Sequence, residues 1–397
     1  MKSQLSNKQL FLQHVGQTSA FPMAVEIERA EGIYMYGPDG KKYIDLISGI
    51  AVSSLGHNHS KVVSAVKEQA EKHMHVMVYG EFVQGPQAQL AKAISDTLPD
   101  PLDAVFFVNS GSEAVEGAMK LAKRYTGLHE IIACKNAYHG ATHGALSLGS
   151  DETFRQPFMP LVPGIRHIGF GDKNQLNLIN KNTAAVIIET VQGEAGIKIA
   201  SGDYYVALRK RCSETGTLLI LDEIQTGFGR TGKFWGFEHY GIVPDIITSA
   251  KGMGGGMPIG AFISSSEIMK ALQTDPVLGH ITTFGGHPVS CAASLAMLKE
   301  LESTKLYVQA EAKALLFKKY LVHPKIKEIR HIGLMMAVQF ESFEQVKYII
   351  DHSMKRGLIT DWFLFCDDAI RIAPPLTISN AEIKTACDVL LEIIERC

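Results

Sequence analysis

Two kinds of apolar pattern follow one another over most of the chain. Continuous apolar runs at residues 185–189, 218–222 and 260–263 are typical of strands buried on both faces. Other segments have helical spacing. Residues 104–125 pass from a β-type apolar run to a helix whose apolar positions recur every three or four residues at Val115, Ala118, Met119 and Ala122. Strands that alternate with helices predict an α/β fold with a large, mainly parallel sheet.

The same pattern predicts how the chain is divided. The turn Pro38-Asp39-Gly40 predicts a hairpin near the start. After residues 285–286 come a long helical stretch, the run GLMMAVQF, a helix ending near Gly357 and a last helix from about Ser379, which together predict a smaller α/β domain. We therefore expect a large domain over residues 46–285, a small domain over residues 286–397, and an N-terminal segment, residues 1–45, that joins the small domain.

Lys251 is the first candidate for chemistry. It follows the apolar run DIITSA and precedes the glycine-rich run GMGGGMPIG. A lysine at the end of a buried strand is desolvated, so its pKa falls and more of it is the free amine that attacks a carbonyl carbon. The glycines let the backbone turn close to a bulky ligand. Taken alone, a solvated loop lysine is the more common outcome, and the order Gly-Lys-Ser/Thr of a nucleotide phosphate loop is absent.

Asp222 strengthens the case for a site. It ends the apolar run Leu218 to Leu221, and carboxylates at the carboxyl end of a parallel strand face the crevice in which α/β sheets bind ligands. A buried aspartate needs a donor or cation as partner. Pyridoxal phosphate (PLP) supplies one in its protonated ring nitrogen, which the ring needs in order to accept electrons. A helix cap or a metal ligand is the alternative role for Asp222.

A phosphate site is predicted where the strand of residues 104–109 meets the following helix, at Ser110-Gly111-Ser112. The free N–H groups of a first helical turn and the helix dipole stabilise an anion. Ser110 and Glu113 also have the spacing of a capping box, which is a purely structural role.

Eight segments then carry a family resemblance: GIAVSSLGHNHSKVV (49–63), VNSGSEAVEGAMKLAKR (108–124), AYHGATHGALS (137–147), IIETVQGEAG (187–196), LILDEIQTGFGRTG (219–232), SAKGMGGGMPIGA (249–261), TTFGGHP (282–288) and IRIAPPL (370–376). In these segments and their order the chain resembles the class III PLP-dependent aminotransferases of fold type I, and among them the acetylornithine, ornithine and 4-aminobutyrate aminotransferases. The resemblance covers nearly the whole chain.

The resemblance implies a role for each matching residue. Lys251 would carry the cofactor, Asp222 would pair with the ring nitrogen, Gln225 would lie near the ring hydroxyl and Tyr138 would stack on the ring. The whole set of cofactor contacts that it implies is Ser110, Gly111, Ser112, Tyr138, Glu189, Asp222, Gln225, Lys251 and Thr283. Thr283 corresponds to a threonine that reaches the phosphate from the neighbouring subunit, which implies a homodimer with shared active sites.

On the substrate side, Arg371 corresponds to the arginine that grips a carboxylate, and a planar guanidinium suits that task because it offers two parallel donors. Glu194 corresponds to the glutamate that neutralises this arginine when no substrate carboxylate is present. The segment after Tyr138 departs from the branch, since Ala141 stands where an arginine binds a substrate carboxylate. Thr190 stands where proline is usual.

Composition adds limits rather than chemistry. The chain has 397 residues, 46% of them hydrophobic and 20% charged, with a formal net charge of −2. These values favour a globular enzyme and give no reason to expect nucleic acid or a membrane as partner. Six cysteines without paired spacing and the absence of a signal-like apolar run lead us to expect a cytoplasmic protein. The pairs His57/His59 and His73/His75 lack a ligand framework, so no metal is expected.

The predicted function is transfer of an amino group from an ω-amine or amino acid donor to a 2-oxo acid, such as 2-oxoglutarate or pyruvate, by a ping-pong mechanism. Because Ala141 lacks the charge of an arginine, we expect donors that need no carboxylate contact at position 141. Two alternatives remain: an aminomutase, decarboxylase or racemase with the same cofactor, and a cofactor-free binding or scaffold protein.

Overall fold

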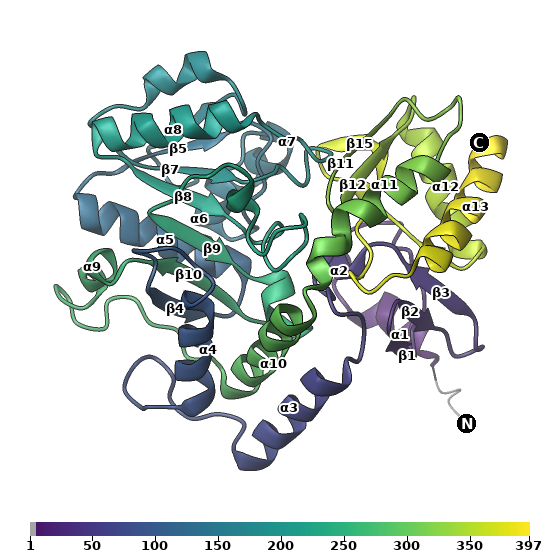
Figure 1. Ribbon diagram of the computed structural model, residues 1–397, viewed down its shortest axis with the longest axis horizontal. Coiled ribbons are helices and arrows are strands. Elements are labelled where there is room, and N and C mark those ends of the chain that lie inside the picture. The colour runs from purple at the N-terminus through teal and green to yellow at the C-terminus, as the bar shows by residue number, and fades with distance from the viewer. Residues whose placement is uncertain (1–4) are drawn as a thin grey trace.

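The computed structural model describes residues 5–397, so residues 1–4 of the predicted N-terminal segment lie outside the described residues. The largest sheet has seven strands and lies on the left in Figure 1. The strand order is β4 (Ala104–Val108), β10 (Gly260–Ser264), β9 (Ile246–Ser249), β8 (Leu218–Asp222), β7 (Thr183–Glu189), β5 (Glu130–Cys134) and β6 (Ile165–Ile168).

Five strands of this sheet, β9 to β6 in that order, pair in parallel, whereas β10 runs antiparallel to both its neighbours. The prediction of a mainly parallel sheet is therefore confirmed, and all seven residues of β7 are buried. Side chains alternate between the two faces of a strand. In β8, Leu218 and Ile220 accordingly join the apolar cluster under α5 (Gly111–Thr126), while Leu219 and Leu221 join the cluster that contains Tyr204 and Leu208 of α8 (Gly202–Thr215).

Two smaller sheets lie on the other side of the molecule. One has the order β1 (Arg29–Glu31), β2 (Tyr34–Tyr36), β3 (Lys42–Asp45) and β13 (Leu358–Ile359), and the other has the order β11 (Glu328–Ile332), β12 (Met335–Gln339), β15 (Cys366–Ile372) and β14 (Trp362–Phe363). The hairpin predicted at residues 38–40 is confirmed, because β2 and β3 pair antiparallel around it.

Segments from the two ends of the chain are joined by backbone pairing. β13 lies parallel to β3, with Leu358 opposite Ile44. The N–H of Ala373 donates to the carbonyl of Leu46 (2.6 Å), and the N–H of Leu376 donates to that of Ser54 (2.8 Å). Figure 1 shows the N-terminal strands beside the C-terminal helices, on the right. This arrangement agrees with an N-terminal segment that joins the small domain, although the domain boundaries stay a prediction.

The remaining helices cover the sheets. They are α1 (Asn7–His14), α2 (Ser48–Ala51), α3 (Ser60–Lys72), α4 (Gly85–Ser95), α6 (His143–Ser147), α7 (Glu152–Arg155), α9 (Ser266–Met269), α10 (Pro288–Thr304), α11 (Ala310–Tyr320), α12 (Phe343–Lys355) and α13 (Asn380–Arg396). The last begins as predicted, because Ser379 caps it in a capping box with Glu382. None of the helices between residues 5 and 397 has the length and apolar content that a bilayer crossing requires.

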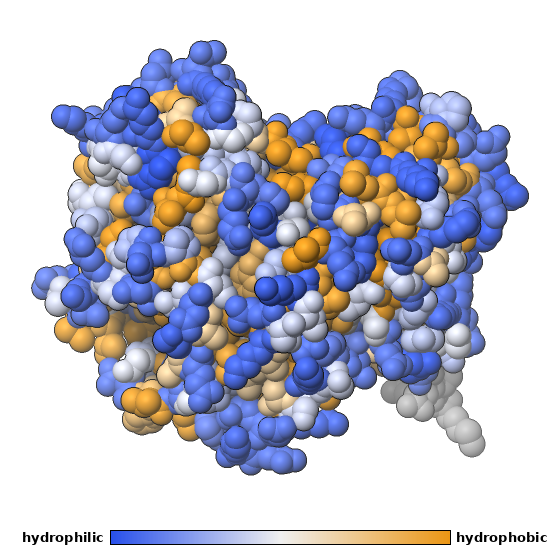
Figure 2. All heavy atoms as spheres, in the orientation of Figure 1, coloured by the Kyte–Doolittle hydropathy of each residue, from blue (hydrophilic) through white to orange (hydrophobic). Residues whose placement is uncertain are grey.

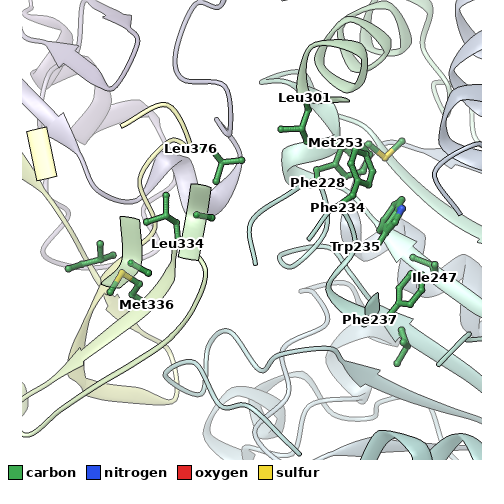
Figure 3. Close-up of a cluster of buried hydrophobic side chains, with 14 of the residues drawn as sticks. Phe228, Phe234, Trp235, Phe237, Ile247, Met253, Leu301, Leu334, Met336 and Leu376 are labelled. Carbon is green, nitrogen blue, oxygen red and sulfur yellow. The ribbon is translucent and has the colours of Figure 1, made fainter. Parts of the chain in front are cut away.

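The backbone of α2 and an aromatic cluster are two notable local features of the fold. The turn α2 is left-handed, with φ between 51° and 64° at Ser48, Gly49, Ile50 and Ala51, a conformation that costs energy outside glycine and must be held by its surroundings. Figure 3 shows Phe228, Phe234 and Trp235 packed together near Met253, just beyond Lys251 in the chain. Hydrophilic side chains cover most of the face in Figure 2, and apolar ones gather at its centre and over the C-terminal elements.

Candidate active site

Three neighbouring parallel strands end at one edge of the large sheet, and their ends supply the centre of the site. Glu189 ends β7, Asp222 ends β8 directly opposite it, and Lys251 follows β9 by two residues. These side chains line one cavity of about 460 Å³. Also in its lining are Ser110, Gly111, Ser112, Tyr138, Glu194 and Gln225. The structure therefore brings together nine of the sequence-predicted residues.

Lys251 lies in a backbone conformation with φ of 48°, which is uncommon for a residue with a side chain. Of the glycines after it, Gly255 and Gly256 have positive φ, so the chain turns there as expected. Burial lowers the pKa of Lys251. The negative charge of Glu194 raises it, the positive charge of Arg371 lowers it further, and the charges of Asp222 and Glu189 raise it. The net pKa is below the ordinary value, so more of the amine is unprotonated.

Asp222 is held by a residue that the sequence analysis did not select, His139. The Asp222 Oδ2 lies 2.7 Å from Nδ1 of His139, and its Oδ1 accepts the N–H of Ile224 at 3.0 Å. Burial lowers the pKa of His139, but the hydrogen bond and charge of Asp222 outweigh burial and raise it overall. His139 thus holds the Asp222 side chain at the wall of the cavity. The adjacent Tyr138 in AYHG was the one signal of this residue in the sequence.

Glu189 joins two loops of the site. Its carboxylate accepts the N–H of Tyr138 at 3.0 Å and the N–H of Gly193 at 2.9 Å. It is 6% exposed, and burial raises its pKa to about 7. The side chain thus fixes the backbone that carries Tyr138 and the loop that carries Glu194.

The helix α5 opens onto the cavity with its N-terminus. Ser110 caps the helix by accepting the N–H of Glu113, and Ser112 Oγ accepts the N–H of Ala141, so both hydroxyls keep a hydrogen to donate. The amides of the first turn have no acceptor within the helix. The predicted capping box is wrong in one respect, because the Glu113 carboxylate accepts the N–H of Asn109 rather than that of Ser110.

Arg371 forms a buried ion pair with Glu194, which lines the cavity. The Arg371 Nη1 and Nη2 donate to the two oxygens of Glu194 at 2.8 and 2.9 Å, and the side chains are 4% and 7% exposed. The Arg371 Nε donates to a second carboxylate, Asp361, at 3.0 Å. Gln225 Nε2 lies 3.5 Å from Glu194 Oε1. Asp361 was missed because it lies ten residues before Arg371 and only the fold brings the two together.

Three predicted residues are not in the lining of the cavity of their own chain. Arg371 is buried and pairs with Glu194, which does line the cavity. Ala141 is exposed, and Thr283 is exposed in the loop before α10. Thr190 does have a partner, since its hydroxyl donates to the buried carboxylate of Glu223 at 2.6 Å, and a proline there could not. Among the paired histidines, His57 Nε2 lies 2.8 Å from Asp45 Oδ2, and His73 is the C-cap residue of α3.

The residues around this cavity fit PLP. Donor hydroxyls and free helix amides suit a phosphate, a buried carboxylate backed by a histidine suits a protonated ring nitrogen, and a desolvated amine suits an aldehyde. All of them open onto a single cavity that is large enough for a ring of this size.

Comparison with known proteins gives the same class. Residues 15–394 match the family Aminotransferase class-III. The chain is 41% identical to an acetylornithine aminotransferase of Methanopyrus kandleri over 94% of both chains, and 39% identical to a putrescine aminotransferase of Pectobacterium atrosepticum over 89% of this chain and 80% of the relative. An ornithine aminotransferase of Toxoplasma gondii, described with PLP at its active site, has a TM-score of 0.90 at 29% identity and covers 97% of this chain and 92% of that one.

The chain belongs to the class III aminotransferases. It is an enzyme that uses PLP to transfer an amino group from an amino donor to an oxo acid, and its fold is that of fold type I. The aminomutase, decarboxylase, racemase and scaffold alternatives are thereby set aside.

The raised pKa of Glu189 makes a prediction for the cofactor-free protein. Because the folded state favours the protonated carboxyl up to about pH 7, the wild type loses stability as pH rises from the ordinary value of 4.5 through 7. In Glu189→Gln this loss is absent. Urea unfolding at pH 5 and pH 8 should therefore show that the free energy of unfolding of the wild type falls relative to that of the variant.

The exposed Glu152, changed to Gln, is the control and should show no such trend. A difference between wild type and Glu189→Gln that is constant or grows with pH would contradict the prediction.

Proposed function

We propose that Lys251 holds the cofactor and moves the proton on which amino transfer depends. Its lowered pKa leaves an amine that can attack the cofactor aldehyde and, once displaced by the donor, take a proton from the donor carbon at Nζ. The bound cofactor supplies an electron sink for the bond that is broken. The observation that carries this proposal is that Lys251, Asp222 and the N-terminus of α5 line one cavity.

The other lining residues orient the cofactor in this proposal. Ser110, Gly111 and Ser112 hold the phosphate, Asp222 with His139 holds the proton of the ring nitrogen, and Tyr138 covers the ring. Gln225 lies where its amide can donate near the ring hydroxyl. Glu189 contributes by fixing the backbone of Tyr138. In support, each of these side chains already has its partner in the protein or faces the cavity.

Arg371 binds the carboxylate of the 2-oxo acid. During the half-reaction with the amine donor, the Glu194 carboxylate pairs with Arg371 instead. A buried guanidinium without a partner is costly, so the pair with Glu194 keeps the site stable while a carboxylate-free amine is bound. An acceptor carboxylate offers the same bidentate geometry to Nη1 and Nη2. The proposed acceptors are 2-oxoglutarate and pyruvate.

We propose further that the preferred donor is an ω-amine that carries no carboxylate near residue 141, such as a diamine. Lys251 is the one lysine or arginine among the described residues that line the cavity. Ala141 offers no charge, and Glu194 occupies Arg371. The 39% identity to a putrescine aminotransferase supports this choice. N-acetylornithine is the second candidate, favoured by the 41% identity to an acetylornithine aminotransferase.

A panel of donors tests the choice. Diamines, ω-amino acids, ornithine and N-acetylornithine are each assayed with 2-oxoglutarate and with pyruvate, and the kcat/KM values are compared because their ratio reports differential transition-state binding. We expect a diamine or another ω-amine to lead N-acetylornithine by about tenfold or more, since one lost ionic contact is worth at least that factor.

The variant Ala141→Arg restores the missing guanidinium and should shift the ratio towards N-acetylornithine. A wild type that prefers N-acetylornithine or ornithine by a wide margin would refute the diamine proposal.

The enzyme is proposed to be a homodimer in which Thr283 reaches the cofactor phosphate of the other subunit. In support, Thr283 is exposed beside Ile281 and Phe284, which are 45% and 51% exposed, and Phe82 and Val83 are 54% and 99% exposed. Large apolar side chains that are open to water in this way mark contact surfaces.

Thr283→Ala should bind PLP more weakly without loss of folded structure, because one donor to the phosphate is removed from a surface position. Cofactor retention is measured by absorbance after dialysis, folding by circular dichroism, and mass by sedimentation. Thr142→Ala, also exposed, is the control. A wild type that sediments as a monomer and still holds its cofactor would overturn the shared site.

A further inference from the structure

Arg371 has two carboxylate partners, and they occupy different edges of its guanidinium. Glu194 accepts from Nη1 and Nη2, and Asp361 accepts from Nε at 3.0 Å. The Asp361 side chain is 17% exposed, so all three charges are largely removed from water. One buried cation therefore faces two carboxylates.

The two carboxylates differ in how they are tied to Arg371. Asp361 directly precedes β14, which pairs with β15, the strand that carries Arg371, and the Arg371 N–H donates to the Asp361 carbonyl at 2.8 Å. The Phe363 ring, also in β14, lies under the guanidinium at 4.5 Å from its centroid. Glu194 comes from the loop after β7, on the large sheet. The Glu194 carboxylate also accepts the N–H of Leu364 at 3.2 Å, and its carbonyl accepts the N–H of Phe365 at 3.0 Å. Asp361 is thus held to Arg371 by adjacent strands of one sheet, whereas Glu194 reaches the guanidinium from the large sheet.

We propose that Asp361 is a positioning and specificity-determining residue for the acceptor: it fixes the guanidinium by its Nε edge while the other edge changes partner, and its negative charge limits the affinity for the incoming carboxylate. The proposal rests on the proposed function, in which Arg371 binds the acceptor carboxylate. When that carboxylate binds, the displaced Glu194 remains in the site, so Asp361 faces one more negative charge than before. Acceptor binding is therefore weakened for as long as Asp361 is ionised.

The surroundings of Asp361 make this charge dependent on pH. Burial raises the pKa of Asp361 to about 6; Arg371 opposes the rise, and the charges of Glu194 and Asp45 add to it. These groups face it from β15, from the loop after β7 and from β3. Protonation of Asp361 below about pH 6 removes the repulsion, so the acceptor binds more tightly on the acid side than at pH 8.

The experiment uses the PLP-loaded enzyme and compares the wild type with Asp361→Asn, which keeps an oxygen acceptor for Nε and removes the charge. Values of kcat/KM and KM are measured for 2-oxoglutarate and for a carboxylate-free amine donor between pH 5.5 and pH 8.5. Calorimetric titration with 2-oxoglutarate gives a dissociation constant independent of turnover. Asp367→Asn, which changes an exposed carboxylate in β15, the strand of Arg371, is the matched control.

For the wild type, we expect KM for 2-oxoglutarate, divided by KM for the donor, to rise with pH through about 6. Asp361→Asn should remove this rise and tighten 2-oxoglutarate binding at pH 8 by about tenfold, the factor that corresponds to one pKa unit of charge interaction. Asp367→Asn should follow the wild type. If Asp361→Asn does not fold, the wild-type pH profile still tests the proposal, and a ratio that is flat from pH 5.5 to pH 8.5 overturns it.

Arg371→Met separates this proposal from the one on which it rests. If Arg371→Met leaves the 2-oxoglutarate dissociation constant unchanged, the assigned role of Arg371 is wrong. If Arg371→Met weakens binding but Asp361→Asn has the affinity and pH profile of the wild type, Arg371 keeps its role and the inference about Asp361 is overturned.

Discussion

The balance between burial and charge at Lys251 is the constraint on which the rest of the site depends. Removal of water favours the neutral amine, and the charges of Glu194, Asp222 and Glu189 oppose it. If burial were less complete, the amine would be protonated and unable to attack a carbonyl. If the carboxylates lacked partners of their own, they would hold the proton on Lys251 more strongly. Each nearby carboxylate is therefore already engaged, Asp222 by His139, Glu194 by Arg371 and Glu189 by two backbone amides.

The fold meets this constraint through the geometry of parallel strands. Strands that run the same way end at the same edge of the sheet. Glu189 and Asp222 lie opposite each other at the ends of β7 and β8, and Lys251 follows the end of β9 by two residues. The small antiparallel sheet delivers Arg371 from the other side, and backbone bonds such as Ala373 to Leu46 hold it against the segment that leads to α2. The site thus lies where the large sheet and the small antiparallel sheet meet.

The sequence was sufficient for the features that depend on neighbours along the chain. The strands around 185–189 and 218–222, the hairpin at 38–40 and the cavity position of Lys251 follow from local patterns. It was not sufficient where the partner is distant. His139 contacts Asp222, which is 83 positions away in the sequence. Asp361 lies next to Arg371 only because β14 pairs with β15. The antiparallel direction of β10 was also hidden, because a buried strand has the same apolar run in either direction.

The central claim is tested most directly by the pKa of Lys251 in the cofactor-free protein, measured by competitive labelling of amines over a range of pH with mass spectrometry. A desolvated lysine in this cavity should titrate below the value of a free lysine side chain, and His139→Ala, which removes the side-chain partner of Asp222, should raise that pKa. A wild-type Lys251 that titrates at or above the value of a free lysine side chain would contradict the account.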